Sequence, residues 1–350
     1  MTMEFLKKLL TTPGPSTEET RSAQVWREEA ATFADNIQTD VRGNTFAILN
    51  GADLPRVLLA GHIDEIGVIV THIDEKGFVY FGPVGGWDPQ VLVGQRIRLL
   101  GREGELIGVV GKKAIHLMKP EERKNASQID DLWIDIGAKD RDEALQWVQV
   151  GTVGVIDVQP YELPHGRVVS RSIDNRIGAY TVLEALRLMA VDRPKATVAA
   201  VATTQEEIGL AGAATAAFSF DPQVSIAVDV THATDYPEAK PKQSGEASLG
   251  GGPSLTVGSV NSPVVFRMLV DVAEKESIPY SVKVTPRFSG TDGDAIYRAR
   301  GGVATAVISI PNRYMHSPNE MIQMSDVEHA AQLIAAFVRS LSSETDFIPV

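Results

Sequence analysis

The chain contains no cysteine among its 350 residues. This absence excludes disulfide bonds, thiolate metal ligands and a cysteine nucleophile. Any metal ion in the protein must therefore be held by histidine, aspartate or glutamate side chains.

Basic residues are scarce relative to acidic ones, and the net charge is -12. A nucleic-acid-binding protein normally presents a basic face, and anionic membranes attract basic patches. The chain also lacks the run of about 18 apolar residues that a membrane-spanning helix requires, and no signal-peptide segment precedes Pro13. We therefore expect a cytoplasmic protein that binds neither nucleic acid nor membrane.

Short apolar runs alternate with helical patterns over much of the chain. The apolar content of 43% is ordinary for a globular protein, and the length is sufficient for two domains. The runs cover residues 56–60, 196–203, 224–230 and 302–310, and the helical patterns cover 177–189, 263–275 and 326–341. This alternation predicts an α/β fold with a mostly parallel, mixed sheet and helices on both faces. Near the N-terminus, Ser16 and Glu19 have capping-box spacing and predict a helix of about 18 residues.

The stretch from residue 70 to 163 has a different pattern. Apolar and polar residues alternate with period two, as in 95–100 and 105–110, and glycines interrupt the short strands. Helical pattern is scarce there. We therefore predict a catalytic α/β domain formed by residues 1–69 and 164–350, with a small β-rich, barrel-like domain inserted at 70–163.

Two adjacent acids, Glu206 and Glu207, follow the apolar run at 196–203. Like charges repel, and burial of either one is unfavourable unless something compensates its charge. A solvated strand end is one explanation. A bound cation is the other.

The other apolar runs are also followed by groups that can bind metal. His62 and Asp64 follow the first run, Asp229 ends the third, and His316 lies six residues after the fourth. Asp174 precedes the helical pattern at 177–189. Because ligands bind at the carboxyl ends of the strands in open α/β sheets, we expect these groups to converge on one edge.

Two histidines and three or more carboxylates, without sulfur, suit borderline to hard divalent ions. Five ligands fit a pair of ions that share one carboxylate and lie about 3.5–4 Å apart. Because adjacent side chains on an extended segment face apart, one of Glu206 and Glu207 can be a ligand while the other reaches the attacking water. Side chains two apart face the same way, so Asp64 can hold the second ring nitrogen of His62.

Each of these residues also has a structural explanation when it is taken alone. His62 and His316 can be structural histidines, Asp174 can be a helix N-cap, and Asp229 can be a loop acid. The metal site is favoured because all of them fall at one expected edge of the sheet.

Six motifs resemble those of the M42 family of metallo-aminopeptidases, the tetrahedral aminopeptidases. They occur in the family's order and span nearly the whole chain: GHIDEIG at 61–67, IDNRIG at 173–178, EEIGL at 206–210, DVT at 229–231, SGTD at 289–292 and RYMHSP at 313–318. Two features depart from the family pattern. Ile173 stands where the family more often has a bulkier residue, and the loop at 236–253 is longer and more charged.

The resemblance implies a zinc-peptidase type of fold and a role for each site residue. His62 and Asp229 would hold one divalent ion, Glu207 and His316 would hold the other, and Asp174 would bridge them. Glu206 would be the general base and Asp64 the orienting residue. The two ions in each subunit would be zinc first, with cobalt or manganese as alternatives.

The activity that the resemblance implies is that of a di-metal aminopeptidase. It would remove the N-terminal residue from short peptides with a free N-terminus, using a metal-bridging water activated by Glu206. The β-rich insert would be a dimerisation domain, and the dimers would form a tetrahedral dodecamer that encloses the active sites. Arg287 is either a surface arginine or a cation that faces acidic N-terminal side chains.

Three other functions remain open from the residues. A glycoside hydrolase, endoglucanase-like, needs two carboxyl groups about 5–9.5 Å apart and gives no role to His62 or His316. A related two-metal peptidase or deacylase, acting at a carboxyl terminus or on an acylated amino acid, would use the same metal chemistry. A non-enzymatic assembly protein would carry the site as a relic.

Overall fold

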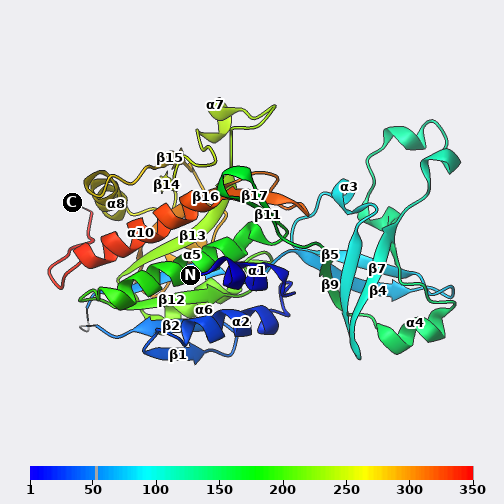
Figure 1. The fold of residues 1–350 in the computed structure, drawn as a ribbon, viewed down its shortest axis with the longest axis horizontal. Helices are drawn as coiled ribbons and strands as arrows, with labels where there is room; N and C mark the ends of the chain where they lie inside the picture. Colours follow the sequence, from blue (N-terminus) through cyan, green and yellow to red (C-terminus); the bar gives the residue numbers. More distant parts are fainter. Residues whose placement is uncertain (52–53, 350) are drawn as a thin grey trace.

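The computed structural model describes residues 1–51 and 54–349. Figure 1 shows an α/β unit joined by extended segments to a smaller barrel. The α/β unit is built on an eight-stranded sheet with the order β1-β2-β12-β3-β13-β16-β14-β15. Its strands are β1 (Asn36–Thr39), β2 (Thr45–Leu49), β3 (Arg56–His62), β12 (Thr197–Thr203), β13 (Val224–His232), β14 (Ser254–Val257), β15 (Ser281–Val284) and β16 (Ala304–Asn312).

The four central strands β12, β3, β13 and β16 are parallel to one another. The flanking strands β2 and β14 run antiparallel to them, so the sheet is mixed. In the register, Thr203 lies opposite His62, and Asp229 lies opposite Ser309. The carboxyl ends of the central strands therefore form one common edge, and the predicted mostly parallel, mixed sheet is confirmed.

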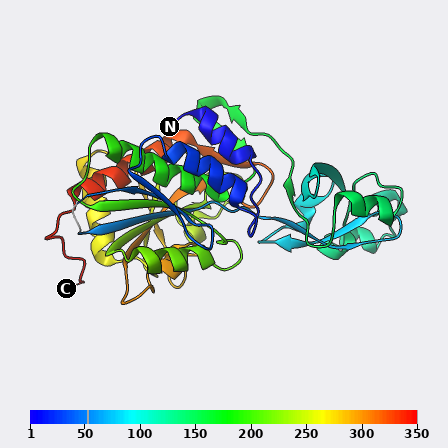
Figure 2. The same ribbon diagram turned by 90° about the horizontal axis from the view of Figure 1, so that it is seen from below.

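Helices cover both faces of this sheet (Figure 2). One face packs against α1 (Met3–Thr11), α2 (Thr20–Ala30), α5 (Ile173–Val191), α8 (Pro263–Lys275) and α10 (Met324–Ser340), and the other packs against α6 (Ala211–Phe220) and α9 (Gly293–Ile296). Along β3, Val57 and Leu59 join the first core, whereas Leu58 and Ala60 join the second. Because both faces of the strand are buried, its sequence is almost continuously apolar.

The inserted β-rich segment forms a closed barrel with the order β4-β5-β8-β7-β6-β9. Its strands are β4 (Gly67–Ile73), β5 (Val79–Val84), β6 (Arg96–Gly101), β7 (Gly104–Gly111), β8 (Trp133–Asp135) and β9 (Val153–Ile156), with α3 (Pro89–Leu92) and α4 (Arg141–Trp147) beside them. The barrel has an apolar core of its own, which includes Ile97, Leu99 and Ile134. The predicted barrel-like insert is thus confirmed, while the boundaries at residues 70 and 163 stay a prediction.

A small three-stranded sheet combines strands from two distant parts of the chain. It consists of β10 (Tyr161–Leu163), β11 (Arg167–Ser170) and β17 (Glu320–Gln323), in that order. Strands β10 and β11 follow the barrel along the chain and lead into α5. Strand β17 lies directly before α10. In the part of the chain that the structure describes, no helix has the length and apolarity that crossing a membrane would take.

The predicted N-terminal capping box is wrong. Helix α2 begins at Thr20, spans 11 residues, and receives no side-chain cap from Glu19. The Ser16 hydroxyl instead donates to Asp64 at 2.7 Å, and the Glu19 carboxylate accepts hydrogen bonds from the backbone of Thr17 and Gln205. Both side chains satisfy polar groups at the carboxyl edge of the sheet, which tertiary packing brings against this segment.

Candidate metal centre

Asp174 lies at the centre of the predicted ligands. Its Oδ1 is 3.3 Å from His62 Nε2, and its Oδ2 is 3.3 Å from His316 Nε2. The residue sits in the irregular first turn of α5, where the side chain of Asn175 accepts a hydrogen bond from the Gly178 N–H. Asn175 therefore caps the helix. The preceding residue, Asp174, has both carboxylate oxygens facing histidines.

The acids and histidines of the site form three overlapping groups of three: the first joins His62 to Glu206 and Glu207, and the other two share Asp174. Of these two, one contains His62, Asp174 and Asp229, and the other contains Asp174, Glu207 and His316; within each group the ligand atoms lie within 4.8 Å of one another. His62 Nε2 is 4.0 Å from Asp229 Oδ1, and His316 Nε2 is 3.6 Å from Glu207 Oε1. The structure thus brings together all five residues that were predicted as metal ligands.

Asp64 organises the turn that carries the two adjacent glutamates. Its Oδ1 accepts from the Glu206 N–H at 3.1 Å, and its Oδ2 accepts from the Glu207 N–H at 3.2 Å. His62 Nδ1 lies 3.2 Å from the Asp64 backbone carbonyl oxygen and 3.4 Å from Asp64 Oδ1, while the other ring nitrogen faces Asp174. One buried carboxylate therefore positions both the glutamate turn and the His62 ring.

Glu206 lies beside these groups, with its Oε2 at 3.6 Å from His62 Nε2. Both neighbouring glutamates face the cluster, because the chain turns sharply after β12. Gln205, which precedes them, has a left-handed φ of 57°. His316 and Ser172 also have positive φ values, of 58° and 55°. Such backbone is uncommon for residues other than glycine and concentrates at functional sites.

Burial and mutual repulsion raise the pKa values of three acids in this cluster, Glu206, Glu207 and Asp229. Burial raises the pKa of Glu207 to about 8, and the Asp174 charge acts in the same direction. Burial likewise raises the pKa of Asp229 and of Glu206 well above their ordinary values. The side chains of the site therefore carry more potential negative charge than they compensate, which favours a bound cation.

The two histidines lower the pKa of Asp174, in contrast to the raised pKa values of the other three acids. Burial alone would raise the pKa of Asp174, but hydrogen bonds from His316 and His62 hold it below its ordinary value. The same contact raises the pKa of His316 to about 9. Asp174 therefore stays a carboxylate between the two histidine side chains.

Sequence reasoning missed Glu320, which is buried at 2% exposure. Its two carboxylate oxygens accept from the backbone N–H groups of Asp174, at 2.8 Å, and His316, at 2.7 Å. It thus ties together the segments that carry two ligands. Glu320 begins the short strand β17 and does not follow an apolar run, so nothing in the local sequence marks it.

Asp292 is a second acid without a predicted role. It accepts a hydrogen bond from the Thr203 hydroxyl at the end of β12, and burial raises its pKa to about 6. It lies in the SGTD motif at 289–292, so that motif was the signal that could have found it.

Two glycines allow α5 to approach strands β3 and β13 closely behind the site. A Cβ on Gly61 would lie 2.4 Å from the carbonyl carbon of Gly178, and a Cβ on Gly178 would lie 2.5 Å from the Val228 carbonyl oxygen. Only glycine fits at such distances. This contact brings His62, directly after Gly61, to the start of the helix that carries Asp174.

The residues present fit a pair of divalent cations. The five side chains offer nitrogen and oxygen atoms and no sulfur. Among the described residues, the buried Glu207 Oε1 has no hydrogen-bond partner. A buried carboxylate oxygen without a donor is unfavourable, and a cation would satisfy it.

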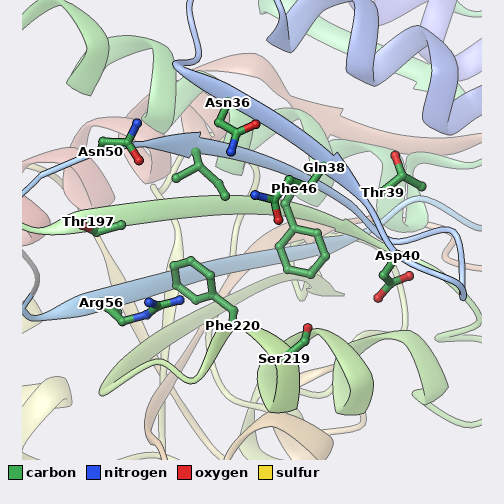
Figure 3. A pocket seen from close by; sticks show the side chains of 11 residues that line it. Asn36, Gln38, Thr39, Asp40, Phe46, Asn50, Arg56, Thr197, Ser219 and Phe220 are labelled. Atoms are coloured by element: carbon green, nitrogen blue, oxygen red, sulfur yellow. The ribbon is translucent and has the colours of Figure 1, made fainter.

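A hollow of about 370 Å³ lies elsewhere, at the amino ends of β3 and β12. Figure 3 shows Phe46, Phe220 and Arg56 around it, and the Arg56 guanidinium lies 4.4 Å from the centre of the Phe220 ring. Because Arg56 begins β3 and His62 ends it, this hollow and the metal centre lie at opposite ends of the same strand.

The mixed α/β fold and the cluster of histidines and carboxylates at the carboxyl edge of its sheet are features of a metal-dependent hydrolase. The model of the M42 glutamyl aminopeptidase family matches residues 43–333. The chain belongs to this family.

Individual relatives are similar to this chain over nearly its full length. The lysyl aminopeptidase of Pyrococcus furiosus is 37% identical over 350 residues, which cover 99% of each chain. The crystal structure of a TET aminopeptidase from a marine sediment archaeon of the Thaumarchaeota is 34% identical, with a TM-score of 0.94 over 98% of this chain and 97% of that one.

A Pyrococcus horikoshii TET1 peptidase that assembles into a tetrahedron or a large octahedral shell is 32% identical, with a TM-score of 0.86 over 97% of this chain and 99% of that one. The chain is therefore an enzyme, a hydrolase of the aminopeptidase type, in a metal-dependent family.

Proposed function

We propose that the protein is a di-metal aminopeptidase that removes the N-terminal residue from short peptides with a free amino terminus. The observation that carries this proposal is the placement of Asp174, whose two oxygens face His62 and His316 at 3.3 Å each. His62 and Asp229 would hold one divalent ion and Glu207 and His316 the other, with Asp174 shared. Zinc is the first expectation, with cobalt or manganese as alternatives.

When bound, the ion pair would supply Lewis acidity and a water of lowered pKa. Glu206 acts as the general base in this proposal. Its carboxylate takes a proton from the attacking water and returns it to the leaving amine. Asp64 holds the Glu206 and Glu207 N–H groups and thereby keeps the base in place beside the ligands.

The alternative functions receive less support. A glycoside hydrolase would use two carboxyl groups alone, whereas here the buried carboxylates are interleaved with His62 and His316. A two-metal carboxypeptidase or deacylase would use the same centre, but the relatives named above are aminopeptidases. A relic site would tolerate loss of ligands, and all five side chains still converge.

The test is a chelator-and-rescue assay on peptides with free and N-acetylated amino termini. We expect hydrolysis that is lost on chelation, restored by zinc or cobalt, and absent on the acetylated peptides. Turnover of acetylated peptides would favour the deacylase alternative. Activity indifferent to the chelator would contradict the metal mechanism altogether.

We also propose that the barrel mediates dimerisation and that the dimers form a tetrahedral dodecamer. The barrel exposes apolar side chains: Ile107 and Val109 on β7, and Ile115 and Leu117 in the segment that follows, are 43%, 47%, 59% and 73% exposed. The Pyrococcus horikoshii relative assembles into closed shells. Light scattering of the native protein and of the I107E/V109E variant tests this; an unchanged mass would contradict it. The cytoplasmic location stays a prediction.

A further inference from the structure

The hollow at the amino ends of β3 and β12 contains a cation without a counter-ion in the described part of the chain (Figure 3). Arg56 begins β3, and its guanidinium carbon lies 4.4 Å from the centre of the Phe220 ring on α6. Leu58, two residues further along β3, belongs to the core beneath α6, so Arg56 faces the same side of the sheet. Within residues 1–51 and 54–349, the Arg56 side chain has neither a hydrogen bond nor an ion pair, and its Nε is buried. A half-buried guanidinium without an acceptor is unfavourable and needs an explanation.

A second arginine beside the same helix shows what Arg56 lacks. The guanidinium carbon of Arg300 lies 4.3 Å from the centre of the Phe218 ring, and its Nε is 3.0 Å from the Asp221 carboxylate. A guanidinium that stacks on a ring keeps its N–H donors in its own plane, where they suit a carboxylate. At Arg300 the chain itself supplies that carboxylate. At Arg56 the described residues supply the ring alone, so a carboxylate from another molecule would complete the same arrangement.

The walls of the hollow combine apolar side chains with amide groups. Phe46 on β2 lies opposite Gln38 on the edge strand β1, and Ile48 lies opposite Asn36 in the same strand pair. All four line the hollow; the two apolar side chains are buried and the two amides are exposed. The volume of about 370 Å³ falls within the range of about 300–1,000 Å³ that is typical of small-molecule sites. Such walls suit a ligand with a hydrophobic body and hydrogen-bonding groups along it.

The charges around the hollow indicate which anion fits. Arg56 is the basic residue that lines it, and Asp40, the acidic one, lies at the opposite end (Figure 3). Asp40 already accepts hydrogen bonds from the backbone N–H groups of Arg42 and Asn44. One cation suits a carboxylate, with its single charge, better than a phosphate group, which carries nearly two charges at neutral pH. A free amino acid would also place an ammonium group beside Arg56, whereas the last residue of a peptide has an uncharged amide there.

We propose that this hollow binds the C-terminal residue of a short peptide. Its carboxylate would pair with Arg56, a large apolar side chain would lie against Phe46 and Phe220, and the exposed amides would bond to the peptide backbone. The seven residues of β3 place its two ends about 20 Å apart. Because a dipeptide extends to at most about 7 Å, one that is held here cannot reach the metal centre. The site is therefore separate from the proposed reaction, and the inference does not depend on hydrolysis.

The experiment measures binding of N-acetyl-Ala-Phe, of its C-terminal amide and of free phenylalanine by calorimetry. The acetyl group removes the free amino terminus, so an aminopeptidase cannot consume the probe. We expect saturable binding of N-acetyl-Ala-Phe to the native protein. The C-terminal amide, and the R56M variant with the free acid, should each bind about 10- to 100-fold more weakly, because a charge-assisted hydrogen bond is lost. R300M is the matched control, and it should change binding by less than about twofold.

Two further measurements separate the parts of the proposal. N-acetyl-Ala-Gly should bind about 10-fold more weakly than N-acetyl-Ala-Phe, because the buried ring is lost. S219W fills the hollow from the exposed surface of α6 without altering Arg56, and it should abolish binding even if R56M proves unstable in thermal unfolding. Free phenylalanine that binds as tightly as the acetylated dipeptide would overturn the assignment to a peptide. Binding insensitive to both R56M and S219W, or no saturable binding at millimolar concentrations, would overturn the site itself.

Discussion

The carboxyl edge of the eight-stranded sheet and the interior of the barrel are both buried, yet different side chains fill them. Between residues 67 and 156, all of which the structure describes, the buried polar residues are Ser127 and Thr152. The sheet edge, in contrast, buries many ionisable groups: His62, Asp64, Glu65, Arg171, Asp174, Arg176, Asp229, Asp292 and Glu320. A buried aliphatic side chain stabilises a fold by about 1.5–3 kcal/mol, whereas a buried charge destabilises it unless it is paired.

The comparison shows that the barrel interior serves stability, whereas the charged groups gather at the sheet edge, where the candidate site lies. The barrel interior is apolar and needs no compensation. Behind the metal centre, Glu65 compensates two buried guanidinium groups, those of Arg171 and Arg176, and Arg176 also donates to backbone carbonyls of Leu9 and Thr12. At the centre itself the acids outnumber the cations. That imbalance is the local signature of a site made for a ligand rather than for packing.

The largest expected effect comes from removing the chemistry while leaving the fold intact. Glu206→Gln should lower kcat by about 10²- to 10⁴-fold, because the general base is lost. Its metal content, measured by atomic absorption, should stay near that of the native protein. The matched neighbour Glu207→Gln should instead release metal. Persistent turnover in Glu206→Gln would show that the base is misassigned.

The second effect concerns the charges that support the site. Glu65→Gln leaves Arg171 and Arg176 buried together without a carboxylate, and the free energy of unfolding should fall by about 3–5 kcal/mol. Urea unfolding followed by circular dichroism measures it. The control is Glu105→Gln on the barrel, which breaks surface ion pairs with Arg21 and Arg98. Because Arg98 keeps its ion pair with Asp157, stability should change by less than about 1 kcal/mol. Equal effects in the two variants would remove the contrast between the regions.

The third effect tests backbone packing in the two regions with the same substitution. Gly61→Ala places a methyl group 2.4 Å from the Gly178 backbone, so β3 and α5 must separate, and we expect a loss of about 1–3 kcal/mol together with weaker metal binding. On barrel strand β5, a methyl group on Gly82 would meet only side-chain methyls, at 3.5 Å from Thr71 and 3.9 Å from Ile69. Gly82→Ala should therefore be nearly neutral. Thermal unfolding of both variants decides the comparison.

The smallest effect is a pH dependence at the surface, away from both buried regions. Hydrogen bonds from Arg193 and from the Asn50 backbone hold the pKa of Asp35 below its ordinary value. Because the folded pKa is the lower one, this contact stabilises the protein above the unfolded pKa of about 3.9 and is lost as pH falls through the folded value. Arg193→Met should thus be slightly destabilised at neutral pH and indistinguishable from native at about pH 2. Urea midpoints that differ equally at both pH values would contradict this.

Much of the sheet could be predicted because burial on both faces leaves a continuous apolar run. The run at 224–230 corresponds to β13 (Val224–His232), and the helical pattern at 263–275 coincides with α8 (Pro263–Lys275). The N-terminal segment could not be predicted in this way. Ser16 and Glu19 fit a local capping motif, but their side chains satisfy distant partners at Asp64 and Gln205, and tertiary contacts prevailed over the local pattern.

The same division holds in the candidate site. The seven residues predicted for it all lie together, because strand ends in a parallel sheet share an edge. Glu320 was missed, since it does not follow an apolar run and one of its two contacts is with Asp174, far away in the chain.

The sequence by itself determined the chemistry that is available: oxygen and nitrogen ligands without sulfur, acids and histidines at the ends of buried strands, and an excess of negative charge. The spacing of apolar residues along the chain indicates which side chains are buried, because burial favours an apolar residue at each position separately. Only the tertiary structure decided that the two oxygens of Asp174 face two different histidines and that Glu320 joins the backbone of Asp174 and His316. Those contacts depend on strand register, helix placement and side-chain direction, which no local pattern encodes.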